Sequence, residues 1–311
     1  MAILVVGSVA FDSVETPSGR ADRCLAGAAT YFSLAASYFT DIRVIAVVGE
    51  DFTAKEEDVL KRRGVDTRGI EHVSGKSFFW RGSYMNNLNE AQTKETHLNV
   101  FEKFSPTIPA EYADSEFLFL ANIDPVLQEK VRQQMPRVRM VCGDTMNYWI
   151  NDHRENLERV LRGLDCLLIN DGEAKLLAKD ANLVRAAGKI LAAGPKGLVV
   201  KHGEYGATAF FSDRLFPGET KSVSLPFRAP ALPLSEVVDP TGAGDCFAGG
   251  FFGYLASQKE ITPSIFKQAM FYGGVMGSFA VERFCTERLQ SLTREEIDQR
   301  FALFRELSHL D

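Results

Sequence analysis

The chain has 311 residues, 45% of them hydrophobic and 24% charged, which is enough apolar material for a large buried core. Its formal net charge of −6 comes without a block of basic residues and excludes nucleic acid as the main partner, because such binding depends on neutralising phosphates. Residues 2–11 lack the basic region and cleavage pattern of a signal peptide, and no apolar run approaches membrane-spanning length, so we expect a cytoplasmic protein without a membrane partner.

Short β-rich runs alternate with stretches of helical length along most of the chain. The β-rich runs are 3–6, 44–48, 117–120, 138–142, 166–169 and 198–201. The helical stretches are 28–38, 54–63, 125–134, 155–161, 173–193 and 293–310. Thr293 and Glu296 form a capping-box pattern before the last of these. Near-continuous apolar strands joined by helical crossovers predict an α/β fold with a parallel sheet covered by helices on both faces.

Residues 72–104 interrupt this alternation. Two strand-like segments, 76–84 and 96–104, flank a polar loop at 86–94. A hairpin outside the main alternation suits a small β lid. The alternative is an antiparallel sheet edge without a function of its own.

The five cysteines, at positions 24, 142, 166, 246 and 285, contain no C-x-x-C spacing. Cys142 and Cys166 lie in apolar, strand-like runs. Buried free thiols in a reducing cytosol are therefore the expected state.

The most informative segment is Asp239-Pro-Thr-Gly-Ala-Gly-Asp245. It follows residues 235–238, which can be read as a strand, and precedes an apolar segment of helical length at 246–255. The first N–H groups of a helix have no intrahelical partner and form a site for an anion such as phosphate. A carboxylate in the first turn could take the proton of an alcohol, although it is also ordinary compensation of the helix dipole.

Three glycines within the predicted helix favour a functional role for this turn. Gly249, Gly250 and Gly253 each weaken a helix by about 1 kcal/mol relative to alanine. Such residues usually mark close backbone packing or a nearby ligand.

The segment 239–245 resembles the second signature of the ribokinase/PfkB carbohydrate kinase family, and other segments match in the family's order over nearly the whole chain. The resemblance implies one ribokinase-like three-layer sandwich over residues 1–311, with a β lid around 72–104. It implies transfer of the γ-phosphoryl group of ATP to a hydroxyl of a small sugar-like alcohol. Asp245 would be the general base, and the N–H groups of Gly242, Ala243 and Gly244 would hold the phosphoryl oxygens.

Two segments near the start are assigned to the acceptor. Asp12, read as the end of the first strand, would bind two neighbouring hydroxyls, and the alternative is a carboxylate that caps a turn. Residues 25–36 are similar to the family's first signature, which makes Gly27 a substrate-site residue. Tyr31 stands where many sugar kinases have an asparagine, which favours a stacking or larger acceptor unless Tyr31 is simply a core aromatic.

Two further segments are assigned to ATP and Mg²⁺. Asn170-Asp-Gly-Glu173 is similar to the family's N-x-x-E motif, in which the glutamate places magnesium through water, and capping of a helix by Asn170 is a compatible alternative. Lys201 and Gly203 lie in a loop that borders the nucleotide phosphates in this family. A tight turn with a solvated lysine is the alternative for that loop.

Polar residues at other predicted strand ends complete the candidate site. Asn122 and Asp144 are assigned to the substrate, with Asp124, Asn147 and Trp149 beside them. The resemblance also places Thr241 at the nucleotide and Asp239 at a monovalent cation such as K⁺.

Two other functions stay open. One is a nucleoside kinase of the same family, and the other is a nucleotide-binding sensor without catalysis, which the presence of Asp245 and Glu173 disfavours. Pairing of two lids would give a homodimer. A Rossmann dehydrogenase and a Walker-type NTPase are disfavoured, because G-x-G-x-x-G after the first strand and G-x-x-x-x-G-K-[ST] are absent.

Overall fold

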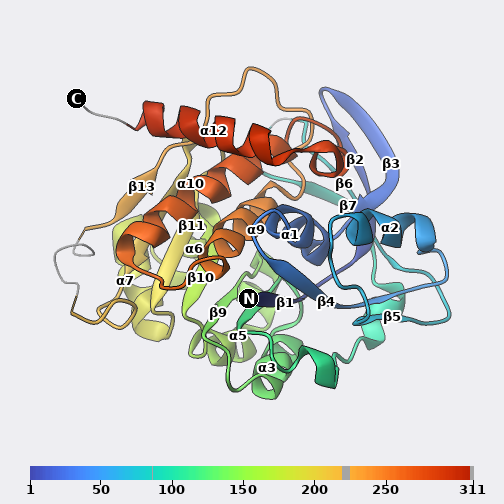
Figure 1. The fold of residues 1–311 in the computed structure, drawn as a ribbon, viewed down its shortest axis with the longest axis horizontal. Coiled ribbons are helices and arrows are strands. Elements are labelled where there is room, and N and C mark those ends of the chain that lie inside the picture. The colour runs from blue at the N-terminus through green and yellow to red at the C-terminus, as the bar shows by residue number, and fades with distance from the viewer. Residues whose placement is uncertain (86, 219–224, 309–311) are drawn as a thin grey trace.

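The computed structural model describes residues 1–85, 87–218 and 225–308, and it places their strands in two sheets, one of nine strands and one of four (Figure 1). The large sheet has the order β13-β12-β11-β10-β9-β8-β1-β4-β5. Its strands are β1 (Ala2–Val6), β4 (Asp41–Val48), β5 (Ile70–His72), β8 (Phe117–Leu120), β9 (Met140–Gly143), β10 (Cys166–Asn170), β11 (Gly197–Lys201), β12 (Ala207–Phe211) and β13 (Phe227–Ala229). The strands from β11 to β5 are parallel, and β12 and β13 add antiparallel strands at one edge.

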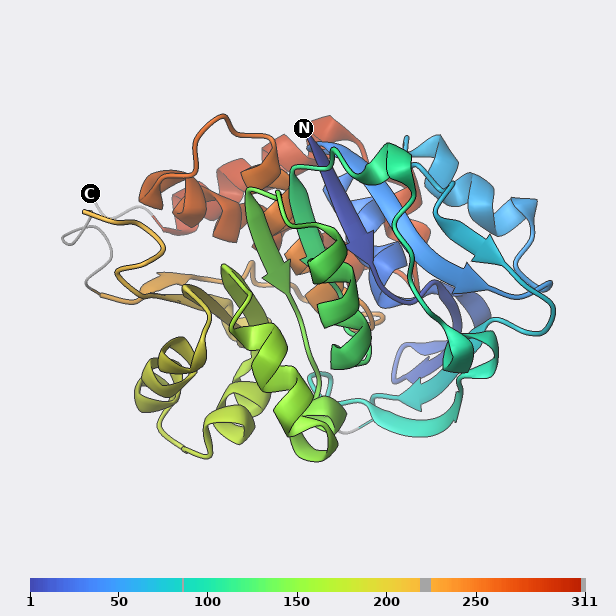
Figure 2. The same cartoon turned by 90° about the horizontal axis from the view of Figure 1, so that it is seen from below.

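Helices cover both faces of the large sheet (Figure 2). One layer consists of α3 (Pro125–Gln134), α4 (Asn147–Asp152), α5 (Arg154–Leu161), α6 (Asp171–Ala178) and α7 (Leu183–Ala193). The other consists of α1 (Ala28–Ala36), α2 (Ala54–Arg62), α9 (Ala243–Ala256), α10 (Pro263–Ala280), α11 (Glu287–Ser291) and α12 (Arg294–Leu307).

Alternate residues of β1 pack against the two helix layers. Ile3 and Val5 belong to the core that includes α1 and α9, whereas Leu4 and Val6 belong to the core that includes α3 and α5. Because both faces of such a strand are buried, its sequence is a continuous apolar run. The predicted three-layer α/β architecture is confirmed. Within the described ranges, no helix combines the length and the apolar character needed to span a lipid bilayer.

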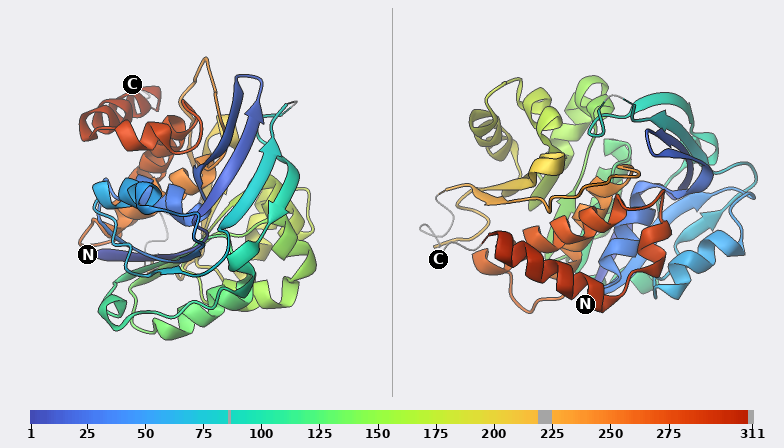
Figure 3. Two further views of the ribbon diagram at one scale, coloured as in Figure 1. Left: turned by 90° about the vertical axis from the view of Figure 1, so that its right-hand side faces the viewer. Right: turned by 90° about the horizontal axis from the view of Figure 1, so that it is seen from above.

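The four-stranded sheet stands to one side of the large sheet (Figure 3). Its order is β3-β2-β6-β7, with β2 (Ala10–Thr16), β3 (Gly19–Ala26), β6 (Phe78–Ser83) and β7 (Gln92–His97). β2 pairs with β6 in parallel, and the other pairs are antiparallel. Two of its strands thus come from the predicted hairpin region, and the other two come from the chain directly after β1.

The predicted run 3–6 matches β1, but the placing of Asp12 at the end of this strand is wrong. β1 ends at Val6, and Asp12 lies within β2 of the small sheet. The break falls at Gly7, where an added Cβ would lie 2.8 Å from the Cβ of Ala121. Both strands are largely buried, so the apolar composition does not mark the break between them.

The boundaries of the hairpin also differ from the prediction. The second strand is Gln92–His97 and leads into a 3₁₀ helix at Asn99–Lys103, whereas a strand was expected at 96–104. Residues 92–94 of the expected polar loop at 86–94 are therefore strand, and residue 86 lies outside the described residues.

Two other predicted elements are corrected. Residues 173–193 form two helices, because Lys179 adopts a left-handed conformation with φ of 50° and Asn182 then caps α7. Residues 235–238 do not form a strand. The capping box of Thr293 and Glu296 is confirmed, although α12 ends at Leu307 and residues 309–311 lie outside the described part.

Two of the five cysteines are not free thiols, contrary to the expectation from the sequence. Cys142, Cys166 and Cys246 are buried and free, as expected. Cys24 and Cys285 form a disulfide across a sequence separation of 261 residues, with Cα atoms 6.3 Å apart. Spacing in the sequence could not reveal this pair, because only the packing of β3 against the segment after α10 brings the two residues together.

The glycines of α9 are explained by close packing between helices. An added Cβ at Gly249 would lie 2.5 Å from the backbone oxygen of Phe32 in α1, and one at Gly250 would lie 2.5 Å from that of Tyr272 in α10. The backbone of α9 therefore lies directly against both neighbours.

Replacing Gly250 with alanine is expected to destabilise the protein by about 1–3 kcal/mol, because the added methyl group meets backbone atoms that cannot yield. Urea unfolding followed by circular dichroism measures this change. Gly188→Ala in α7 is the matched control, because an added Cβ there meets nothing within 4 Å. That control should be neutral or stabilising by up to about 1 kcal/mol, and equal losses in the two variants would contradict the packing argument.

Candidate active site

The turn before α9 lies where the sequence analysis placed an anion site. Gly242 has a φ of 75° and begins the helix, and Asp245 lies in its first turn. The N–H of Ala243 donates to the backbone oxygen of Pro240 at 3.2 Å. Among the described residues, no backbone partner is found for the N–H groups of Gly242 and Gly244, so these two amides are free to bind an anion.

Tyr31 explains why position 242 is a glycine. An added Cβ would lie 2.5 Å from three atoms of the Tyr31 ring, whose side chain is only 1% exposed. The ring is therefore a buried support beneath the turn, and the prediction of a core aromatic is confirmed.

Four charged side chains from four elements converge beside this turn. Asp144 follows β9, Glu173 lies in the first turn of α6, Lys201 ends β11 and Asp245 lies in α9. Nζ of Lys201 lies 3.3 Å from Oδ2 of Asp144, and an added Cβ at Gly244 would lie 3.0 Å from the same Nζ. The ammonium group therefore stands between Asp144 and the turn.

Burial and neighbouring negative charges raise the pKa of Asp245 and of Glu173. Desolvation, with the negative charges of Asp144 and Glu173, raises the pKa of Asp245 to about 7. Desolvation and Asp144 likewise raise the pKa of Glu173 to about 7. Burial opposes the charged form of Lys201, but the surrounding carboxylates outweigh it and raise its pKa. Three carboxyl groups thus surround the single ammonium group of Lys201. A further positive charge at this place would be stabilised by them.

Glu173 also completes a capping box. Its carboxylate accepts the N–H of Asn170 at 2.8 Å, while Oδ1 of Asn170 accepts the N–H of Glu173 at 2.8 Å. Helix capping was the alternative interpretation of this motif, and it is confirmed. It is compatible with a second role of Glu173 at magnesium.

A second group of acids lies on the other side of the turn. Asp12 is 6% exposed, and burial together with Asp239 and Asp245 raises its pKa to about 8. Asp239 is fully buried, and its two carboxylate oxygens accept the N–H groups of Thr241 at 2.9 Å and Cys285 at 2.8 Å. Asp239 therefore ties the turn to the segment after α10.

The remaining predicted residues have clear structural roles. Gly27 has a φ of 103°, and an added Cβ would collide with the backbone oxygen of Ser8. Oδ1 of Asn122 accepts the indole N–H of Trp149 at 2.9 Å, and Asp124 caps α3.

Gly203 lies against the connection between β6 and β7. Its φ is 55°, and an added Cβ would collide with the side chain of Asn89. The small sheet therefore reaches across to the loop that follows Lys201.

The chain matches the pfkB family of carbohydrate kinases over residues 19–286. It belongs to this family. Like its relatives, it is an ATP-dependent kinase that phosphorylates a hydroxyl group.

The kinase is 28% identical to a cytidine kinase of Thermococcus kodakarensis over 261 residues, which cover 81% of this chain and 88% of that protein. In fold it is similar to a nucleoside kinase of Burkholderia thailandensis solved with inosine, with a TM-score of 0.75, 20% identity, and coverage of 97% and 98% of the two chains. It is also similar to a protein described as a ribokinase II from E. coli, solved with ATP and Mg²⁺, with a TM-score of 0.77, 20% identity and coverage of 97% and 99%.

Sequence analysis missed two side chains at this site. Tyr84 is buried, and burial with Asp239 and Asp12 raises its pKa to about 12. The amide Nε2 of Gln128 in α3 donates to three backbone oxygens, including that of Asp144 at 3.0 Å. Neither belongs to a motif, and no local pattern marks them.

The rate of the kinase is expected to fall as the pH falls through about 7. Asp245 accepts a proton only when it is ionised, and with a pKa of about 7 it is mostly protonated below that pH. We expect kcat at saturating acceptor to fall at least about tenfold per pH unit below about pH 6.5, because Glu173 also has a pKa of about 7, and to level off above about pH 7.5. A profile at saturating Mg²⁺ measures it, and a rate that rises on acidification would contradict the assignment of Asp245.

Proposed function

We propose that this kinase transfers the γ-phosphoryl group of ATP to a hydroxyl of a nucleoside. The observation that carries the proposal is the convergence of Asp245, Lys201 and the free amides of Gly242 and Gly244 at the start of α9. Amides and an ammonium group stabilise charge on the transferring phosphoryl group, and a carboxylate of raised pKa suits a general base.

Each residue of the turn has a defined part in the proposed reaction. Asp245 takes the proton of the attacking hydroxyl, and the phosphoryl oxygens lie at the amides of Gly242 and Gly244, next to Ala243. Lys201 and Gly203 border the nucleotide phosphates, and Thr241 lies beside them. The side chain of Thr241 is buried and lies beside Tyr84 and Asp239.

Magnesium fits the group of charges formed by Asp144, Glu173 and Lys201. In the described residues, no three acidic, histidine or cysteine side chains lie close enough to ligate a metal together. Magnesium commonly keeps several waters and takes one or two carboxylates plus substrate phosphates, so Glu173, oriented by Asn170, suffices to hold it. Bound there, Mg²⁺ neutralises charge on the triphosphate.

Asp239 does not fit as a side-chain ligand for K⁺. Both of its carboxylate oxygens accept backbone N–H groups. A monovalent cation at this place would need backbone carbonyl oxygens, and we derive no step from it.

The small sheet is proposed to cover the acceptor. Asp12 in β2 would hold two neighbouring hydroxyls of the acceptor, near Gly27, and Asn122 would line the same side. Contact between Asn89 and Gly203 supports closure over the site, which would exclude water from the phosphoryl group. β7 is exposed along its whole length, and we propose it as the edge through which two copies pair.

The nucleoside acceptor is supported by the cytidine kinase relative, and a free sugar is the second candidate because the family phosphorylates carbohydrates. A coupled ADP-release screen over nucleosides, free sugars and sugar phosphates tests the choice. Turnover of sugars without any turnover of nucleosides would overturn the nucleoside proposal and leave phosphoryl transfer intact.

Replacing Asp12 with alanine is expected to raise the KM for the acceptor by at least about tenfold, which corresponds to the loss of two hydrogen bonds of about 0.5–1.5 kcal/mol each. The value of kcat and the KM for ATP should change little, because the turn before α9 keeps its contacts. Steady-state kinetics with the best substrate of the screen measure the split. Asp22→Ala on the neighbouring strand β3 is an exposed control, and a loss confined to kcat would contradict the role of Asp12.

A further inference from the structure

The disulfide of Cys24 and Cys285 joins the two parts of the site. Cys24 lies directly opposite Asp12 in the ladder between β2 and β3, and its sulfur is 3.3 Å from the backbone oxygen of Asp12. Cys285 donates its N–H to Asp239, whose other carboxylate oxygen accepts the N–H of Thr241. The bond therefore links the strand that carries Asp12 with the carboxylate that anchors the anion-binding turn.

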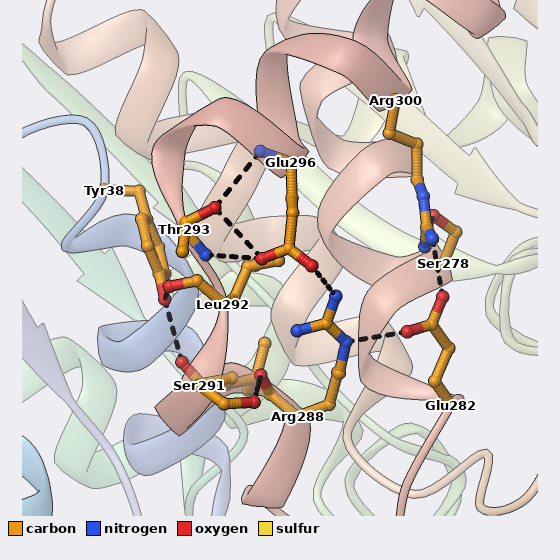
Figure 4. A network of polar contacts seen from close by, with 10 residues as sticks. Tyr38, Ser278, Glu282, Arg288, Ser291, Leu292, Thr293, Glu296 and Arg300 are labelled. Carbon is orange, nitrogen blue, oxygen red and sulfur yellow. Dashed lines mark hydrogen bonds and ion pairs between the residues drawn. The ribbon is translucent and has the colours of Figure 1, made fainter.

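The Cys285 side of this bond is held firmly by other contacts. Glu282 is bridged by Arg288 at 2.7 Å and by Arg300 at 2.6 Å, and Arg288 also contacts Glu296 at 2.6 Å (Figure 4). These ion pairs fix the segment after α10 to α12. Cleavage of the disulfide would leave that segment in place.

The Cys24 side is held less firmly. β3 is an edge strand, the β2–β3 ladder shifts register between Asp12 and Val14, and Arg23 has a left-handed φ of 51°. Thr16 and Ser18 donate to the backbone oxygens of Val238 and Val237 near the turn of the hairpin, and Arg23 pairs with Asp51 at 2.8 Å. The disulfide is the covalent tie between this hairpin and the segment after α10, and its loss would act chiefly on β2 and β3.

We infer that Cys24 and Cys285 are positioning residues whose bond sets Asp12 relative to the anion-binding turn, so that reduction of the bond weakens acceptor binding. This inference rests on the proposed role of Asp12. In a reducing cytosol, which the sequence analysis predicts for this chain, the disulfides that do occur are mostly catalytic or redox-sensing rather than permanent. The pair therefore fits a bond that is made and broken.

A dithiol can reduce this bond without further reactants. Cys24 is partly exposed and Cys285 is buried, so a dithiol thiolate attacks the sulfur of Cys24, and Cys285 leaves as a thiolate that takes up a proton. The second thiolate of the dithiol then attacks the dithiol sulfur of the mixed disulfide and releases Cys24. The dithiol becomes a disulfide, and the cysteine pair gains two electrons and two protons.

Hydrogen exchange tests the structural part without any need for an acceptor. Peptide mapping under non-reducing conditions first verifies the bond, and dithiothreitol then reduces it. Faster exchange is expected in residues 10–26, with little change in residues 243–256. An absent bond, or unchanged exchange in residues 10–26 once both thiols are free, would overturn the inference.

Kinetics test the positioning part, with the best acceptor of the nucleoside and sugar screen as probe. Dithiothreitol should raise the KM for that acceptor at least about fivefold, a typical coupling between sites, with kcat and the KM for ATP little changed. The double variant Cys24→Ser/Cys285→Ser should match the reduced protein with or without dithiothreitol, while Cys166→Ser should respond like the wild type. Faster exchange with an unchanged KM for the acceptor would refute the positioning role of the two cysteines. A protein that is inactive on every acceptor would refute the proposed function, but the exchange result would still stand.

Discussion

Asparagine in place of Asp245 should lower kcat by about 10²–10⁴-fold, the usual contribution of a general base. Asparagine keeps the size and the hydrogen-bonding shape of the side chain but cannot accept the proton of the attacking hydroxyl. The carboxyl groups of Asp144 and Glu173 remain beside Lys201, so ATP should still bind. Steady-state kinetics give kcat, and isothermal titration with ATP and Mg²⁺ gives the affinity.

A matched control separates catalysis from compensation of the helix dipole. Glu295 also lies in the first turn of a helix, α12, and is exposed. Glu295→Gln should reduce stability by at most about 1 kcal/mol and leave kcat unchanged. If Asp245→Asn behaved like Glu295→Gln, with near-normal turnover, Asp245 would be only a dipole partner and another base would have to be found.

The parts of the site that sequence analysis predicted best are local in the chain. Residues 239–245 form a turn and the first turn of a helix, so their order alone fixes the free amides and the nearby carboxylate. Asn170 and Glu173 form a capping box for the same reason. Strands β1, β4, β8, β9, β10 and β11 were predicted because they are largely buried on both faces and therefore apolar, whereas the partly exposed edge strands β5, β12 and β13 were not predicted.

The parts that could not be predicted depend on contacts between distant segments. The ion pair of Lys201 and Asp144 spans 57 residues, and the support of Gly242 by Tyr31 spans more than 200. Asp12 was assigned to the first strand because residues 3–14 are buried without interruption on both sides of Gly7. None of these contacts can be recognised from the composition or from the local hydrophobic periodicity of the sequence.

Alanine in place of Gly242 should lower kcat by about 10²–10³-fold, the usual effect of losing one anion-hole donor. The added methyl group would lie 2.5 Å from the ring of Tyr31, and a φ of 75° is unfavourable for alanine. Because Tyr31 is buried, the ring cannot retreat, and the turn has to move its amides away from the phosphoryl oxygens.

Gly64 provides a control with the same backbone conformation and no neighbour. Its φ is 74°, and an added Cβ meets nothing within 4 Å. Gly64→Ala should therefore cost about 1–2 kcal/mol of stability from backbone strain alone, without a change in kcat. The double variant Gly242→Ala/Tyr31→Ala opens space below the turn, and partial recovery of kcat would assign the loss to the clash. An unchanged kcat in Gly242→Ala itself would mean that these amides do not hold the migrating phosphoryl group, and the role of the turn would then rest on Asp245 alone.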